Sequence, residues 1–271
     1  MKIPVLSVSG SKEGEIDLPL VFSTPVRKDL IHKAYIHLES HSFQKQGRYA
    51  NAGMDVVAES NNPPTGHHAA RVARMRGGGG GRQGQGGGVA MVRKGRQAHP
   101  PVVEKVIYKL LNKKENRLAL CSAIAATSSS SLVKLRGHKV DKIESFPIVV
   151  SDQIESVAKS KDLTKIFESL HVSDDIARLE NRLKRRSGKP QLRGRKTKVG
   201  KSILLVVKDA KKLSKASGSI LGVDVVEAKN LNVMDLAPGS RPVRLTAFSK
   251  GAIEEIGKLK APHLELMVAL Q

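Results

Sequence analysis

The segment FPIVVSD, Phe146–Asp152, joins a run of large apolar residues to two residues that favour helix N-termini. A continuous apolar run of this length, rich in β-branched side chains, is typical of a strand covered on both faces. Ser151 or Asp152 then caps a helix, because short oxygen-bearing side chains accept hydrogen bonds from the free amides of a first turn. The apolar face of that predicted helix carries Ile154, Val157, Leu163, Ile166, Phe167 and Leu170.

Short apolar strands and helices continue to alternate along the C-terminal half of the chain. Such alternation favours a mainly parallel sheet with helices on both of its faces. The predicted strands are Ile203–Val207, Val223–Val226 and Arg244–Phe248, and the predicted helices are Val233–Leu236 and Ala252–Ile256.

The N-terminal residues predict two strands and a helix. Ile3–Val8 and Glu15–Leu18 are the strands, on either side of a turn at Gly10–Gly14. Thr24 followed by Pro25 resembles an N-cap and first-turn pair, so a helix is expected to begin there. Its apolar face would carry Val26, Leu30, Ile31, Ala34, Tyr35 and Leu38.

Two further helices are predicted after Pro100 and Pro101. The spacing of the apolar residues in Val102–Leu111 favours a helix with one apolar face. Asn112 and Glu115 have the spacing of a capping box, which would open a second helix. The small residues of that helix suit close packing, and its inward positions are Leu118, Ala119, Ser122, Ala123 and Ala126.

A long basic segment interrupts this pattern. Residues 60–103 contain neither an acidic nor an aromatic side chain, and they include many glycines. Glycine maximises backbone freedom, and the segment has few large apolar groups to bury, so a partner must offset its ordering cost. The basic residues of this segment, all of which are predicted to bind RNA, are Arg71, Arg74, Arg76, Arg82, Arg93, Lys94 and Arg96.

A second segment, residues 182–201, contains ten basic residues and again no acid. Together the two segments account for 17 of the formal net charge of +22. Such localised charge favours a docking surface for a polyanion over a general solubilising coat. Nine of these ten are predicted here to bind RNA: Arg182, Lys184, Arg185, Arg186, Arg193, Arg195, Lys196, Lys198 and Lys201.

Nucleic acid is the favoured polyanion, although a solvated basic face or a localisation signal remains an alternative for Arg182–Arg186 taken alone. The chain has eight aromatic residues, and most of them occupy predicted core positions, so no platform for stacking single-stranded bases is expected. The predicted contacts are therefore with phosphates and RNA shape.

Signals for other chemistry are weak. The segment GRKTKVGKS, Gly194–Ser202, resembles a phosphate-binding loop but has one residue too many between its glycines and leads into a strand. The glycine runs 77–81 and 84–88 lack the preceding strand of a dinucleotide fingerprint. The nine histidines show no metal-ligand spacing, and Cys121 is expected to be a buried structural thiol. Asp174 and Asp175 most simply cap a helix. Neither a catalytic group nor a metal or cofactor is predicted.

A family resemblance rests on five motifs in their order and spacing: PLVFSTPVRKDLIHKA, KGRQAHPP, LRGHKVD, LRGRK and DLAPGSRPVRLTAFS. The chain resembles the large-subunit ribosomal protein four family, in its archaeal and eukaryotic branch, over nearly its whole length. The family implies a single α/β domain with a long internal loop that passes through ribosomal RNA to the peptide exit tunnel.

The resemblance also assigns roles to individual residues. It places the tunnel-facing tip at Arg71, Arg74, Arg76, Gly77 and Gly78. It assigns contacts between the loop stem and RNA to Arg93, Lys94, Arg96 and His99, within or beside the motif KGRQAHPP. The five consecutive glycines 77–81 exceed the number usual in the family and leave the register of the tip open.

The expected fold is therefore α/β: a single three-layer domain with a mainly parallel sheet, spanning 1–271. It contains one long extended basic Gly-rich internal loop at 44–101 and the second basic segment at 182–201. The expected function is that of a structural, non-enzymatic constituent of the large ribosomal subunit. The alternatives are an RNA-processing or modifying enzyme and a free RNA chaperone, each with a basic arm.

The expected partners are large-subunit ribosomal RNA, neighbouring large-subunit proteins and, transiently, the nascent peptide. No membrane is expected as a partner, because no segment approaches the ~18 apolar residues that span a bilayer. No small-molecule substrate is expected either. A single cysteine excludes a disulfide framework, so the reducing cytoplasm is the expected location.

Overall fold

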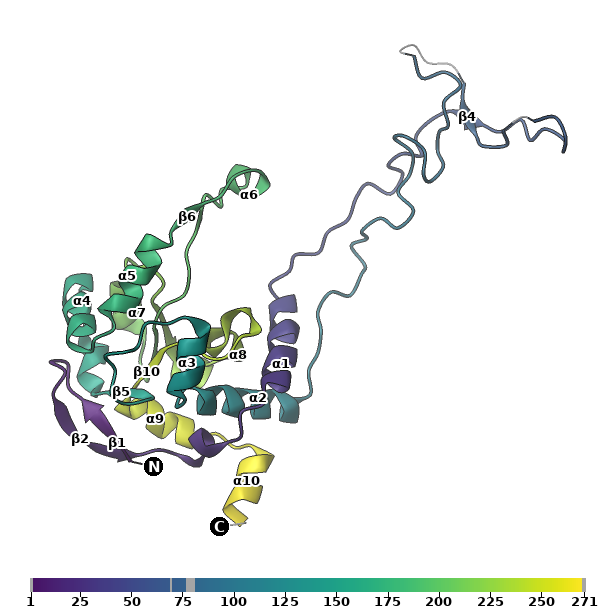
Figure 1. Cartoon of the computed structure of the whole chain (residues 1–271). Coiled ribbons are helices and arrows are strands. Elements are labelled where there is room, and N and C mark those ends of the chain that lie inside the picture. The colour runs from purple at the N-terminus through teal and green to yellow at the C-terminus, as the bar shows by residue number, and fades with distance from the viewer. Residues whose placement is uncertain (1, 69, 77–80, 270–271) are drawn as a thin grey trace. The chain divides into compact units, whose positions relative to one another are not determined.

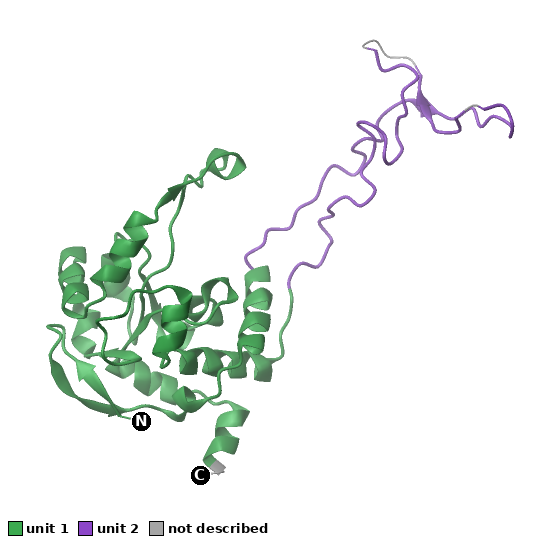
Figure 2. Cartoon of the chain, viewed as in Figure 1, with its two compact units in different colours: residues 1–40, 109–271 green, residues 41–108 purple. Residues whose placement is uncertain are grey.

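A computed structural model describes residues 2–68, 70–76 and 81–269. The chain divides into two compact units, which Figure 2 shows in different colours. Residues 1–40 and 109–271 form the body, and residues 41–108 form the loop unit.

A six-stranded sheet forms the centre of the body, with strand order β2-β1-β5-β10-β8-β9 (Figure 1). The edge strand β2 is antiparallel to β1, and the other neighbouring pairs are parallel. The sheet is therefore mainly parallel, as the sequence predicts. Its strands are β1 (Lys2–Leu6), β2 (Lys12–Asp17), β5 (Ile148–Val150), β8 (Leu204–Val207), β9 (Asp224–Glu227) and β10 (Thr246–Ser249).

Helices cover both faces of this sheet (Figure 1). One face packs against α1 (Lys28–Ser40), α2 (Lys113–Ala126), α8 (Val233–Leu236) and α9 (Lys250–Gly257). The other packs against α3 (Ser130–Arg136), α4 (Ser160–Ser169) and α7 (Lys211–Ser217). The remaining body elements are α5 (Ser173–Asn181), α6 (Lys189–Leu192), α10 (Pro262–Ala269), β6 (Lys184–Arg185), β7 (Thr197–Lys198) and the 3-10 turns η1 (Leu20–Ser23), η2 (Asp152–Ser156), η3 (Ala228–Asn230) and η4 (Pro238–Ser240).

The alternation of side chains along the strands explains why these strands are continuously apolar. In β5, Val149 packs into the core on one face, whereas Ile148 and Val150 pack into the core on the other. The same division separates Leu204 and Val206 from the residues that alternate with them in β8. Both sides of β5 and β8 are buried, so no position in these two strands favours a polar residue. The three-layer prediction is confirmed.

Several helix predictions differ from the structure. Val102–Leu111 forms no helix, and most of its apolar side chains are exposed, so little packing would stabilise an amphipathic helix there. The helix predicted from Ser151 to Leu170 is split into η2 and α4. The helix expected from Thr24 begins at Lys28, and α3 has no counterpart among the predicted elements.

The predicted capping box at the start of α2 does not form. Asn112 is the N-cap, but its side chain accepts no hydrogen bond from the first turn. Glu115 instead accepts hydrogen bonds from Lys33 of α1, with an Nζ–Oε2 distance of 2.9 Å. The carboxylate thus links two helices, a tertiary contact that local spacing does not reveal.

The carboxyl edge of the sheet, where open α/β folds usually hold ligands, is occupied by acidic side chains of the body itself. Glu155 accepts hydrogen bonds from the amides of Lys208 (2.8 Å) and Asp209 (3.3 Å) and from the Ser249 hydroxyl (2.7 Å). Asp152 accepts one from the amide of Gly251, in the first turn of α9 (2.7 Å). These carboxylates take the donors that would otherwise face an anionic ligand.

We predict that Glu155→Ala lowers the free energy of unfolding by about 1–2 kcal/mol, because three donors at the sheet edge lose a charged acceptor. Urea denaturation followed by circular dichroism measures this loss. Glu144→Ala is the matched control, because Glu144 is exposed and pairs only with exposed Lys12, so its loss should change stability by less than about 0.5 kcal/mol. Equal effects of the two substitutions would contradict the assigned role of Glu155.

Candidate nucleic-acid interface

The second basic segment, residues 182–201, is a hairpin that extends from the end of α5 (Figure 1). Its strands β6 and β7 pair Lys184 with Lys198 and Arg185 with Thr197. The amide of Arg186 adds a hydrogen bond to the carbonyl of Lys196, at 2.8 Å. The short helix α6 lies at the far end. We call residues 182–201 the basic hairpin.

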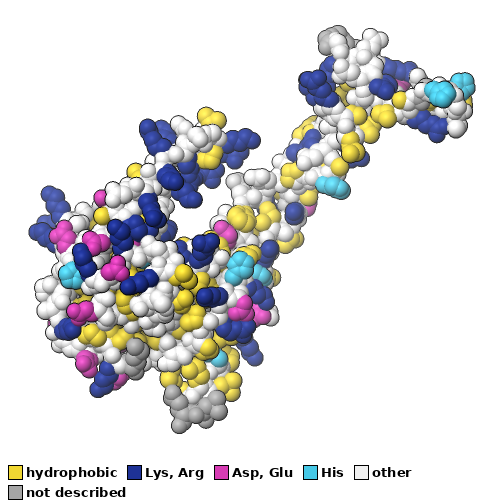
Figure 3. Space-filling view, in the orientation of Figure 1, with side chains coloured by type: hydrophobic (Ala, Val, Ile, Leu, Met, Phe, Trp, Pro, Cys, Tyr) yellow, Lys and Arg dark blue, Asp and Glu magenta, His cyan; other side chains and the backbone are white. Residues whose placement is uncertain are grey.

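Charge on the basic hairpin is almost unneutralised. None of its side chains is buried, and Figure 3 shows Lys and Arg side chains gathered over it. Among the described residues, Lys201 is the one hairpin cation with an ion-pair partner, Asp224, at 2.8 Å. The remaining nine basic side chains are available to phosphates, which is the arrangement expected of an RNA-binding surface.

The loop unit has almost no core of its own. It contains a two-stranded ladder of β3 (Ala58–Glu59) and β4 (Arg74–Met75), and Arg74 also bridges to Gly86. Among the described residues of 41–108, Gly87 alone is buried. Exposed apolar side chains such as Met91, at 102% of the reference area, have no contact surface within the unit.

Glycine is required where the two legs of the loop unit meet. Gly53 adopts a φ of +82°, and a Cβ placed there would lie 2.5 Å from the carbonyl oxygen of Gly95. Any side chain at Gly53 would therefore force the two backbones apart as well as strain the local conformation. Glycine at this position therefore permits the close approach of the two legs.

The three predicted tip arginines make contacts within the loop unit. Arg71 donates to the Thr65 hydroxyl at 2.9 Å, and Arg74 donates to the carbonyl of Gly84 at 3.1 Å. Arg76 forms an ion pair with Glu59 at 2.8 Å. These arginines are therefore not equivalent, because the charge of Arg76 is partly neutralised. Gly77 and Gly78 lie outside the described residues.

The other predicted RNA-binding residues of the loop unit lie along its second leg. Arg93, Lys94, Arg96 and His99 are exposed, whereas Arg82 is half-buried. Within the described part of the unit, no carboxylate pairs with these five side chains. The four arginine and lysine side chains are therefore as free of carboxylate partners as those of the basic hairpin.

Exposed aromatic residues in the loop unit were missed by the sequence analysis. Phe43, Tyr49 and Tyr108 are 52%, 65% and 44% exposed, and the ring of Tyr108 stacks on His41 with centroids 5.4 Å apart. These residues lie outside residues 60–103, the segment from which the RNA-binding loop was predicted. Flat exposed rings can stack on unpaired bases, so these three residues are candidate base contacts that the sequence analysis left out.

A buried polar network under the basic hairpin was also missed. Asp175 is fully buried and accepts hydrogen bonds from His138 Nδ1 (3.0 Å), Arg178 Nε (2.9 Å) and Ser202 Oγ (2.6 Å). Burial raises the pKa of Asp175, but these hydrogen bonds outweigh burial and hold the pKa well below its usual range. Asp175 lies in the first turn of α5, but its side chain accepts no hydrogen bond from an amide of that turn, so the predicted helix cap does not form.

An arginine cluster lies beside that network. Burial, together with the positive charges of Arg244, Arg178 and Arg241, lowers the pKa of Arg136 to about 10. Arg136 donates to the carbonyls of Pro238 and Arg241. The cluster stays protonated at neutral pH and adds positive potential to the side of the body from which the basic hairpin emerges.

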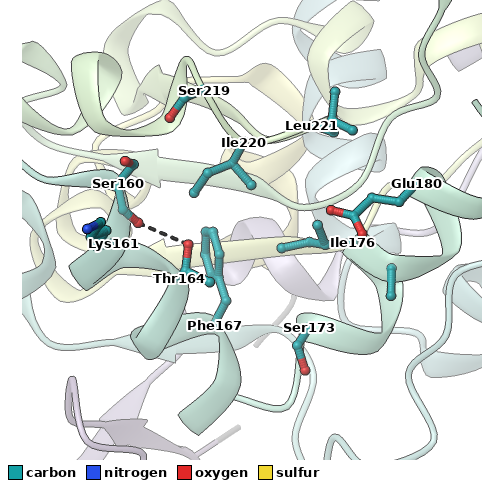
Figure 4. Close-up of a pocket in the computed structure, with 11 residues that line it drawn as sticks. Ser160, Lys161, Thr164, Phe167, Ser173, Ile176, Glu180, Ser219, Ile220 and Leu221 are labelled. Carbon is teal, nitrogen blue, oxygen red and sulfur yellow. Dashed lines mark hydrogen bonds between the residues drawn. The ribbon is translucent and has the colours of Figure 1, made fainter.

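No reaction centre is visible in the described residues. One hollow, of about 500 Å³, has an apolar floor that includes Phe167, Ile176 and Ile220 (Figure 4). Its two ionisable lining residues, Lys161 and Glu180, lie on opposite sides of the view. Catalysis by acid and base groups needs convergent side chains, and this hollow has none.

Cys121 is buried, and burial raises the pKa of its thiol to about 11. It is therefore a structural thiol, as predicted. In the described ranges, no three His, Cys, Asp or Glu side chains are arranged to hold a metal ion. No single described helix is long and apolar enough to cross a membrane. Helices α2 and α3 reach that length and apolar composition only when taken together, and they are bent by 94° at their junction.

Comparison with known proteins identifies the family. The model of the ribosomal protein L4/L1 family matches residues 16–259, so the chain belongs to this family. The chain is 42% identical over 258 residues to the large ribosomal subunit protein uL4 of Methanococcus aeolicus, covering 95% of this chain and 99% of that protein.

Similar relatives come from other archaea. The uL4 protein of Methanococcus maripaludis is 41% identical over 94% of this chain and 98% of its own length. That of Pyrobaculum aerophilum is 41% identical over 94% of this chain and 89% of its own length. The archaeal and eukaryotic branch indicated by the sequence motifs agrees with these archaeal relatives.

Proposed function

We propose that this chain is a structural protein of the large ribosomal subunit that binds ribosomal RNA through its loop unit and its basic hairpin. The observation that carries the proposal is the unneutralised charge of the hairpin, where nine of ten cations have no carboxylate partner among the described residues. Tightly packed RNA phosphates supply the counter-charge that such a surface needs. The names of the archaeal relatives point to the same particle.

The loop unit would penetrate the RNA. Its described residues bury almost nothing against one another, so their ordering cost must be met by phosphates, sugars and bases around them. We assign residues 44–101 to the RNA-penetrating part of a chain that is otherwise a single domain. Its tip, at Arg71, Arg74 and Arg76, would line part of the polypeptide exit tunnel and meet the nascent peptide transiently.

The body would act as an anchor without catalysis. Its sheet edge is filled by Glu155 and Asp152, its lone thiol is buried, and the hollow beside Phe167 lacks convergent ionisable groups. These features support a structural role over an RNA-processing or modifying enzyme. The protein would therefore need no cofactor or small-molecule substrate. It would act in the cytoplasm, within the ribosome and beside other large-subunit proteins.

We predict that the protein co-sediments with the large subunit at about one copy per particle and stays bound after a high-salt wash. Many buried phosphate contacts would make dissociation slow even when free binding is weakened by salt. Sucrose-gradient sedimentation followed by quantitative mass spectrometry measures the copy number before and after washing. Release by the wash would favour the RNA chaperone or processing factor.

We further predict that replacing Arg71, Arg74 and Arg76 by alanine leaves large-subunit yield near normal but changes stalling on charged nascent peptides. The hairpin and the body retain most contacts, whereas three cations would be lost from a narrow passage whose potential acts on the peptide. Subunit yield and ribosome profiling of stalling reporters are the measurements.

The matched control replaces three exposed lysines of α7 on the body, Lys211, Lys212 and Lys215, by alanine. This control removes the same charge but should leave stalling unchanged. If the tip variant loses yield while the surviving ribosomes stall normally, the three arginines belong to an assembly contact.

A further inference from the structure

The basic hairpin cannot fix its own orientation. It has two paired strands of two residues each, and none of its side chains is buried. Isolated two-stranded hairpins are marginal in water, and ten cations on one hairpin repel one another. Whatever holds the hairpin in one direction must therefore act at its root, where residue 182 leaves α5 and residue 201 returns to the sheet.

Asp175 joins the two ends of that root. It lies in the first turn of α5 and accepts a 2.6 Å hydrogen bond from the hydroxyl of Ser202, the residue that follows the hairpin. Arg178, which is held by both oxygens of Asp175, also reaches the carbonyl of Lys201 at 3.4 Å. His138 links the same carboxylate to the sheet, because its Nε2 accepts from the Leu245 amide.

Arg244 binds the backbone of the segment that follows the hairpin, Ser202 and Ile203. It is 1% exposed and donates to the carbonyls of Ser202 (2.5 Å), Ile203 (3.0 Å) and Gly222 (2.8 Å). Its remaining charge is balanced by Asp224, which also pairs with Lys201 of the hairpin. A buried guanidinium satisfied in this way fixes the backbone at the point where the hairpin ends.

Apolar packing also contributes to the root of the hairpin, beside the contacts of Asp175 and Arg244. Leu179 of α5 lies against Gly200 and Gly222, where an added Cβ would approach its side chain to 2.7 Å and 2.2 Å. The absence of side chains at these two glycines lets α5 lie directly on the end of the hairpin. Polar and apolar contacts thus converge on residues 200–202.

We propose that Asp175 and Arg244 are positioning residues for RNA binding: they clamp the root of the basic hairpin so that its cations are presented in one orientation. The inference rests on the proposed RNA-binding function of the hairpin and adds the residues that organise it. Neither residue contacts RNA in this account. Clamping reduces the ordering entropy that binding would otherwise cost, so a loosened root weakens binding without any loss of hairpin charge.

Asp175→Asn tests the proposal, because the loss of negative charge and the loss of positioning should change RNA affinity in opposite directions. Removing a negative charge should by itself strengthen binding to RNA. Both carboxylate oxygens of Asp175 receive at least two donors, so the amide nitrogen of asparagine must face donors in either orientation. We therefore expect about fivefold weaker binding to a transcript of large-subunit ribosomal RNA, measured by filter binding.

Asp174→Asn is the matched control, because it removes the same charge from the neighbouring position. Asp174 pairs with Lys142 on the surface and takes no part in the root contacts. Its substitution should leave binding unchanged or slightly tighter. Ser202→Ala is the second test variant, since it removes the bridge to α5 without changing any charge, and it serves if Asp175→Asn fails to fold by circular dichroism.

A distance measurement separates positioning from general destabilisation. Nitroxide labels at Ser187→Cys in the hairpin and Ser214→Cys on α7 report the orientation of the hairpin relative to the body, and buried Cys121 stays unlabelled. Pulsed electron resonance on the full-length protein should show a broader distance distribution in Asp175→Asn and Ser202→Ala than in Asp174→Asn. Body circular dichroism should be unchanged.

Binding by Asp175→Asn as tight as that by Asp174→Asn would overturn the proposal, whether or not the distance distribution broadens. Failure of the RNA-binding function itself would look different. In that case, replacing Arg193, Arg195 and Lys196 by alanine would leave both affinity and salt dependence unchanged. The proposed function instead predicts that this triple variant lowers the slope of log affinity against log salt by about 2.

Discussion

Repulsion among unpaired cations is the constraint on which this structure depends. Two unit charges about 7 Å apart in water repel by about 0.6 kcal/mol, and a hairpin with ten cations contains many such pairs. A domain is stable by only about 5–15 kcal/mol, so charge of this density must be kept away from the core. The chain does so by confining its two basic segments to a coreless loop unit and an exposed hairpin.

The body supplies what those segments lack. Its sheet is buried on both faces, and alternate residues of β5 and β8 enter two separate cores. The buried Asp175 and Arg244 then transmit this rigidity to the hairpin root. A rigid anchor and charged extensions with little structure of their own suit a protein that orders RNA and is ordered by it.

Sequence alone predicts much of this division. The strands are visible because burial on both faces leaves continuous apolar runs, and the basic segments are visible because charge can be counted. The helix predicted at Val102–Leu111 does not form, because apolar spacing gives a stable helix only where most of the apolar face is packed, and most of these side chains are exposed.

The root of the hairpin could not be predicted for a related reason. Asp175 meets His138 and Ser202, which are 37 and 27 residues away in the chain, so no local pattern reveals the network. Arg244 is fully buried although its residue type is usually exposed. The exposed rings of Phe43 and Tyr49 were missed because the other aromatic residues fill predicted core positions.

Hydrogen–deuterium exchange tests the central claim most directly, namely that RNA rather than the protein's own core orders the basic segments. In the free protein, described amides of 41–108 should exchange within seconds, while those of β8 and β10 remain protected. In the purified large subunit, the amides of 41–108 and of the basic hairpin should become protected as well. Equal protection of the loop unit and the sheet in the free protein, or fast exchange of the loop unit within the subunit, would contradict the account.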